Sequence, residues 1–172
     1  MPRDDKDSPD RLNVPWITED GYLDPTKLPI GSTLTQAVAH DAGKFRSACR
    51  TLTSMALGGR TEAAVFLYGL LAFCGDDRAK KESVVEALRH VRTRQSADLL
   101  FGELRNTESS TATRRYINTI LKALEGFPLA SVADGFEGLL SDSRWSYRMK
   151  RKFREALAGI EARSRWSTSW PG

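Results

Sequence analysis

Residues that commonly carry catalysis or bind metals are scarce in this sequence. Its 172 residues include two cysteines and two histidines. Cys49 and Cys74 lie apart within apolar helical patterns, and His40 and His90 are isolated from other ligand-type residues. Zinc and redox sites need such residues in pairs or clusters at short spacing. We therefore expect two reduced, buried thiols, no metal site and no cofactor.

The sequence motifs of several common enzyme classes are missing as well. There is no glycine-rich phosphate-binding loop, no His-Glu-x-x-His and no Gly-x-Ser-x-Gly. The sequence thus gives no support for an enzyme, and no residue is assigned a catalytic role.

Long apolar runs are absent too. No segment approaches the roughly 18 consecutive apolar residues that a membrane-spanning helix requires. The opening Met-Pro-Arg-Asp-Asp-Lys-Asp is polar and has no apolar run behind it, unlike a secretory signal. We expect a cytoplasmic protein that does not bind membranes.

Proline is concentrated at the start of the chain. Five of the seven prolines fall within residues 1–31, where four basic residues face seven acidic ones. Such a composition disfavours regular structure. We predict an acidic arm over 1–31, with the first ten residues disordered and 12–31 extended against a helical domain over 32–163. A short tail over 164–172 would follow.

An internal repeat is present in the central part of the chain. The pattern Ala-x-x-Leu-x-Gly-x-Leu begins at Ala64, returns at Ala97, and returns at Ala133 with phenylalanine in place of the first leucine. The steps are 33 and 36 residues, which is typical of stacked helix pairs. We predict three pairs, 61–73 with 78–91, 96–105 with 111–125 and 129–140 with 146–162. A single capping helix should precede them, from Ser32 until Gly58 and Gly59 stop it.

This arrangement resembles HEAT-like and armadillo-like repeat proteins. HEAT units often place an acid between the two helices and a basic residue six positions later, which Glu108 with Arg114 and Asp142 with Arg148 match. The first unit departs from this pattern, and the proline common in the first HEAT helix is missing from all three. The resemblance implies an all-α fold, a short right-handed α-solenoid of about three helix pairs plus the capping helix, with the second helices lining its concave surface.

The repeated glycines lie within the first predicted helix of each pair. Gly69, Gly102 and Gly138 each cost roughly 1 kcal/mol of helix propensity relative to alanine. Their recurrence predicts that helix backbones approach one another closely at these positions.

Positive charge is concentrated in the second helices. Between residues 144 and 165 there are eight basic residues and two acidic ones, with aromatic residues nearby. Basic and aromatic side chains together suit phosphate contacts and base stacking. The candidate binding residues are Arg78, Lys81, Arg114, Arg115, Arg144, Trp145, Arg148, Lys150, Arg151, Lys152 and Arg154.

Three interpretations of this basic region remain open. The first is a binding or scaffold module that recognises a protein through the concave surface, with the basic helix a solvated cap and Trp145 covering the end of the core. The second is nucleic-acid binding through the basic C-terminal helix, including a HEAT-like DNA-repair protein of the glycosylase type. The third is an acidic protein partner bound by the basic region. The acidic arm could also fold back on the basic helix and compete with a ligand, so that deleting the arm would strengthen binding.

Overall fold

The computed structural model describes residues 16–18, 20, 22, 24 and 27–168. Across these residues the chain forms eight α-helices and no β-strand, which confirms the prediction of an all-α fold. The helices are α1 (Ile30–Ala37), α2 (Ala42–Leu57), α3 (Thr61–Phe73), α4 (Arg78–Leu88), α5 (Arg94–Asn106), α6 (Arg114–Leu124), α7 (Leu129–Ser141) and α8 (Tyr147–Thr168). No helix in this part of the chain is long and apolar enough to cross a membrane. The first fifteen residues, on which much of the predicted arm falls, lie outside the described residues.

The six helices of the predicted pairs occur close to their predicted positions. Helix α3 has the predicted bounds, and α5, α6 and α7 begin and end within three residues of them. Side-chain caps account for several starts, because Asp77 accepts from Lys80 N at 3.1 Å and Thr93 from Ser96 N at 3.0 Å. Helix α8 continues to Thr168, about six residues past its predicted end.

The prediction of one capping helix over 32–57 is wrong. The chain forms two helices there, α1 and α2, with a break at residues 38–41. Asp41 causes the restart, since its carboxylate accepts a hydrogen bond from Lys44 N at 2.7 Å and so caps α2. Gly59, with φ of 96°, follows the end of α2, as the glycine pair predicts.

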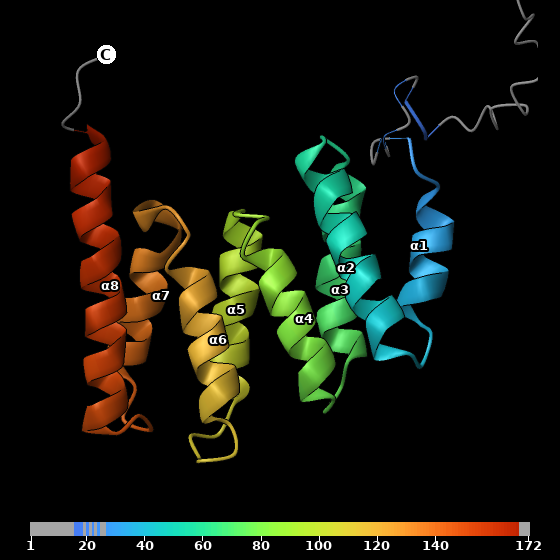
Figure 1. Cartoon of the computed structure of the whole chain (residues 1–172). Helices are drawn as coiled ribbons and strands as arrows, with labels where there is room; N and C mark the ends of the chain where they lie inside the picture. Colours follow the sequence, from blue (N-terminus) through green and yellow to red (C-terminus); the bar gives the residue numbers. More distant parts are fainter. Residues whose placement is uncertain (1–15, 19, 21, 23, 25–26, 169–172) are drawn as a thin grey trace, which may run out of the picture.

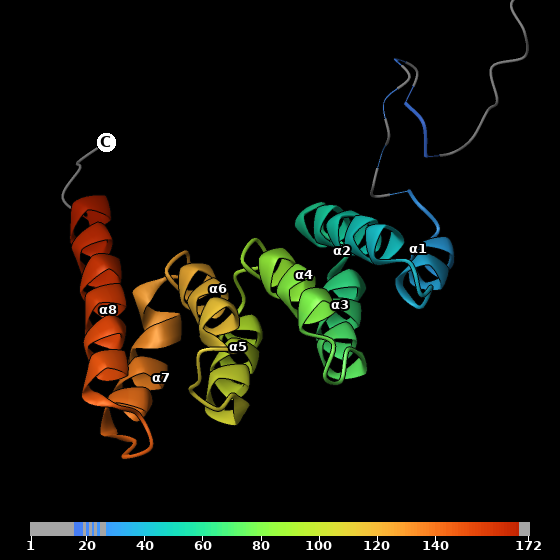
Figure 2. The ribbon, with the colours of Figure 1, turned by 60° about the horizontal axis from the view of Figure 1, so that its bottom comes forward.

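The helices pack as neighbouring antiparallel pairs. Helices α3 and α4, α5 and α6, and α7 and α8 contact one another, and Figure 1 shows them running alternately in opposite directions along one row. Contacts between pairs run from α2 to α4, from α4 to α6 and from α5 to α7. In the turned view of Figure 2, α4 and α6 lie above α3 and α5 as a separate layer. Because the helices of the three pairs alternate in direction, α4, α6 and α8 all begin at the same end of the molecule.

A single apolar core joins all eight helices. Leu67 of the first repeat, Leu100 of the second and Phe136 of the third are each fully buried. Phe101 packs edge-on against Phe136 with 5.2 Å between ring centroids, which links α5 to α7. The central apolar position of the repeat therefore marks the core of α3, α5 and α7, while Ala133 and Leu140 of the third repeat are half-buried.

The repeated glycines do not mark a close approach of helices, so that prediction is wrong. A Cβ atom added at Gly69, Gly102 or Gly138 would meet nothing within 4 Å. The crowded glycine is Gly135, outside the repeat pattern, where an added Cβ would lie 2.6 Å from Phe101 Cζ and closer to two other ring atoms. Gly135 thus lets α7 pack onto the aromatic ring of α5.

Candidate functional site

A groove crosses α2, α4 and α6 on the layer that contains the second helices of the pairs. Its volume is about 700 Å³. Side chains three or four residues apart on each helix line it, so each helix contributes one face. The principal lining residues are Arg46 and Arg50 on α2, Ala79, Glu82, Ser83, Glu86 and Ala87 on α4, His90 just after α4, and Arg115 and Thr119 on α6.

Some charged side chains of this groove form ion pairs and others do not. The Arg115 guanidinium lies 3.3 Å from the Glu82 carboxylate, and Glu86 lies 3.8 Å from Arg89. Within the described part of the chain, neither Arg46 nor Arg50 forms an ion pair. The α2 wall of the groove therefore carries two exposed arginines that form no ion pair with a described residue, while Glu82 and Glu86 of α4 line the same groove.

Sequence reasoning selected Arg115 and missed Arg46 and Arg50. The available signal was their spacing of four residues, which places both arginines on one face of a helix. The two arginines were not among the candidates because residues 32–57 were predicted to cap the repeat stack.

Cys49 also lines the groove, and its side chain is buried. Burial raises the pKa of Cys49 to about 12, and the same cause raises the pKa of Cys74 to about 11. Both cysteines are free and buried, as expected. A thiol with so high a pKa is a poor nucleophile, so these residues act as core side chains.

Arg78 and Lys81 are held by contacts within the fold. Arg78 Nη1 donates to the carbonyl oxygen of Ala112 at 3.2 Å. Lys81 Nζ donates at 2.9 Å to Glu103 Oε2, which also accepts the hydroxyl of Tyr116 at 2.8 Å. Burial, followed by this hydrogen bond, raises the pKa of Tyr116. The network ties α4, α5 and α6 together.

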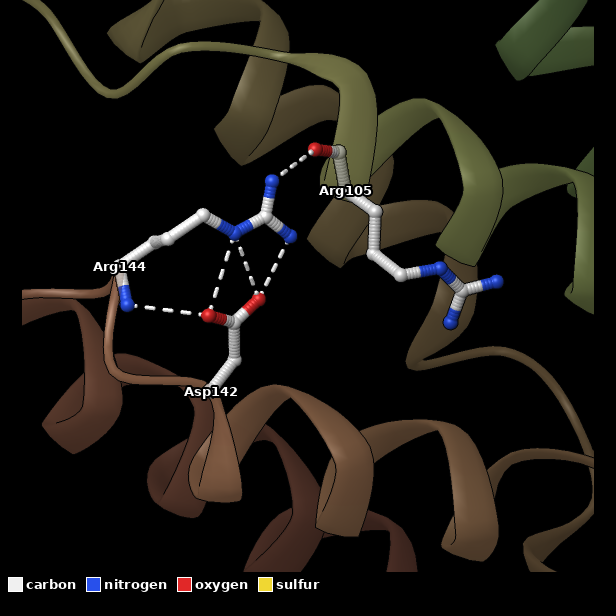
Figure 3. Close-up of polar contacts among 3 residues, drawn as sticks. All are labelled: Arg105, Asp142 and Arg144. Atoms are coloured by element: carbon white, nitrogen blue, oxygen red, sulfur yellow. Dashed lines mark hydrogen bonds and ion pairs between the residues drawn. The ribbon is translucent and has the colours of Figure 1, made fainter.

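Arg144 joins two neighbouring helix pairs (Figure 3). Its Nε and Nη2 donate to the carboxylate of Asp142, the shortest contact being 2.6 Å, and its Nη1 donates to the Arg105 carbonyl oxygen at 3.1 Å. The hydrogen bond from Arg144 lowers the pKa of Asp142 to about 2. The ion-pair partner of Asp142 is thus Arg144, two residues later, and not Arg148, the residue that matched the HEAT pattern.

Trp145 belongs to the core. It is 5% exposed and packs edge-on against Phe153, with 5.1 Å between ring centroids. Its Nε1 has no hydrogen-bond acceptor among the described residues. Burial favours the role of covering the end of the core over that of a ring available for base stacking.

The remaining candidates lie on or near α8. Arg114, Arg148 and Lys152 line a hollow of about 250 Å³ between α6 and α8. Arg151 pairs with Glu155 at 3.4 Å along α8, and Lys150 lies close enough to Asp142 to contribute to its lowered pKa. Arg154 is exposed on α8 away from this hollow. The eleven candidates therefore do not form one surface.

No group of three or more histidine, cysteine, aspartate or glutamate side chains within the described ranges could hold a metal ion. Comparisons of the chain with protein-family models, with curated proteins and with solved structures find no match.

Proposed function

We propose that the chain is a non-catalytic protein-binding module that accepts an acidic segment of a partner protein in the groove across α2, α4 and α6. The observation that carries this proposal is the pair of exposed arginines, Arg46 and Arg50, which form no ion pair with a described residue and lie on one wall of a groove that crosses three helices. A partner segment with carboxylates along one side would neutralise them.

The floor of the groove supports the same proposal. Ala79, Ser83 and Ala87 recur every four residues on α4, so small side chains lie along its centre. Small side chains let the main chain or a helix of a ligand approach closely, while the longer side chains on both walls make the polar contacts. The volume of about 700 Å³ suits a short peptide segment.

We further propose that the helix pairs form a short, right-handed, HEAT-like solenoid with this groove on its concave side. The antiparallel pairs and the contacts of α2 with α4 and of α4 with α6 support this arrangement. In such a stack, neighbouring units combine their faces into one extended binding surface.

The test is selection of peptides from a random display library on the immobilised protein. We expect the selected peptides to be enriched in aspartate and glutamate, and their affinity to fall at least about tenfold for Arg46→Glu/Arg50→Glu, because each lost charge-assisted contact weakens binding. Lys44→Glu is the matched control, since Lys44 is exposed on the same helix but does not line the groove.

Two results would contradict the proposal. One is a selection that returns no acidic peptide. The other is a set of peptides that bind the double variant and the wild-type protein equally. Loss of binding in the Lys44→Glu control alone would place the binding surface elsewhere on α2.

A second candidate function is nucleic-acid binding through α8. The observation in its favour is that Arg148 and Arg154 are exposed on this helix beside Tyr147, which is 79% exposed and available for stacking. If a HEAT-like DNA-repair activity were present, it would require a lesion-bearing substrate. Binding of labelled single- and double-stranded DNA and RNA at low and moderate salt tests this candidate, since phosphate contacts weaken steeply as salt rises.

A further inference from the structure

The hollow between the first turns of α6 and α8 collects positive charge from two helices. Arg114 reaches it from α6, and Arg148 and Lys152 from successive turns of α8. Lys152 is held in place because its Nζ donates to Asn118 Oδ1 at 3.0 Å, an uncharged acceptor that leaves its positive charge intact. Three cations thus share a space of about 250 Å³.

No carboxylate lines this hollow in the described part of the chain. Other basic side chains differ in this respect, since Lys81, Arg115 and Arg144 each lie within 3.3 Å of an acidic partner. Arg114 and Arg148 are exposed and Lys152 is half-buried, so solvent screens part of their mutual repulsion. A bound anion would reduce the remaining repulsion and would meet no carboxylate in the lining.

Residues with side-chain hydroxyl groups line the same space. They are Ser109, Ser110, Thr111 and Ser146, of which Ser146 Oγ accepts from Met149 N at 3.3 Å and Ser110 Oγ accepts from Thr113 N at 3.3 Å. The side chain of Thr113, which precedes α6, does not cap that helix, because its hydroxyl bonds back to the Glu108 carbonyl oxygen. Basic residues at the start of a helix are unfavourable with the helix dipole, and a bound anion would offset that cost.

We propose that this hollow is a binding site for a phosphate monoester, with Arg114, Arg148 and Lys152 as its charged ligands. A monoester carries up to two negative charges on one phosphorus and three terminal oxygens, which suits three cations in a compact hollow. A nucleic acid places one charge on each successive phosphate, so it needs a track of cations, and the pairing of Arg144 with Asp142 and Arg151 with Glu155 interrupts such a track. The proposal is independent of the proposed groove function, because the two sites share no lining residue.

The experiment is calorimetric titration of the full chain with inorganic phosphate, with a phosphoserine peptide and with its unphosphorylated form. We expect saturable binding of both phosphorylated probes, and at least about a tenfold loss of affinity for Arg114→Gln and for Arg148→Gln. Arg154→Gln is the matched control on α8, and its affinity should equal that of the wild type. Circular dichroism of each variant establishes that the fold is intact.

The pH dependence of phosphate affinity distinguishes direct binding by these side chains from a purely structural role. The second ionisation of a monoester has a pKa of about 6, so affinity should rise as the pH increases from about 5 to 7.5. Peptide binding tighter than that of inorganic phosphate would identify a protein-borne phosphate, whereas equal affinities would identify a small phosphorylated ligand. Absence of saturable binding by both probes, or binding of a single-stranded oligonucleotide in their place, would overturn the proposal.

Discussion

Replacing Gly135 with alanine should destabilise the fold, whereas the same replacement at Gly138, three residues later in α7, should stabilise it. The difference comes from the space around the new methyl group. At Gly135 it would enter the ring of Phe101, which is 2% exposed and held edge-on against Phe136. At Gly138 it would meet nothing within 4 Å.

The magnitudes follow from two opposing effects. Replacing glycine with alanine inside a helix stabilises it by about 0.5–1 kcal/mol at either position. Overpacking a filled core costs about 1–3 kcal/mol, and this applies to Gly135 alone because a buried aromatic ring has little room to turn aside. The helix-propensity gain cancels between the two variants. Their free energies of unfolding should therefore differ by about 1–3 kcal/mol.

Urea denaturation followed by far-ultraviolet circular dichroism measures this difference, and thermal unfolding should show a shift of about 2–4 °C for each kcal/mol. Gly69→Ala is the control, since an added Cβ there also meets open space and should stabilise α3. If Gly135→Ala were as stable as Gly138→Ala, the packing of α7 onto Phe101 would not be as described.

Three further predictions concern titratable groups. The thiols of Cys49 and Cys74 have pKa values of about 12 and 11. They should react slowly with a thiol reagent near pH 8 in the native protein and rapidly after unfolding. Fast reaction in the native state would contradict their burial. Tyr116 has a raised pKa, so in the native protein it should stay protonated above pH 10, where unfolded tyrosines ionise. The free energy of unfolding should therefore fall as the pH rises beyond that value. Tyr116→Phe should weaken this fall, as alkaline unfolding curves would show. Asp142 has its pKa lowered to about 2 by Arg144, so its contribution to stability is present above about pH 4 and is lost as the pH falls toward 2. Asp142→Asn should reduce that acid sensitivity, and an unchanged acid unfolding curve would contradict the role of the pair.

The helices of the repeats could be predicted because their signals are local. Apolar side chains recur at helical spacing, and capping residues such as Asp77 and Thr93 mark the starts. The break between α1 and α2 was missed because residues 38–41 contain neither glycine nor proline, and a single aspartate, Asp41, restarts the helix. One capping side chain is a weak signal for a helix boundary.

The close-approach prediction for the repeated glycines was wrong for a different reason. A repeated letter indicates a recurring position but not which face of the helix it occupies, so the open surroundings of Gly138 and the crowded ones of Gly135 could not be told apart. Likewise, sequence reasoning could count the basic residues but could not assign partners from other helices, such as Glu103 of α5 to Lys81 of α4. Contacts between distant segments decide which cations remain available to a ligand.

Three arginines fasten the middle helix pair, α5 and α6, to its neighbours through main-chain oxygens. Arg78 from one side and Arg144 and Arg163 from the other donate to the carbonyl groups of residues 112, 105 and 125. Every amino acid supplies a carbonyl, so mutations that change the side chains at the accepting positions leave these joints in place. The accepting positions should therefore tolerate a change of side chain, whereas each donating position needs a side chain that can reach the carbonyl group and donate to it.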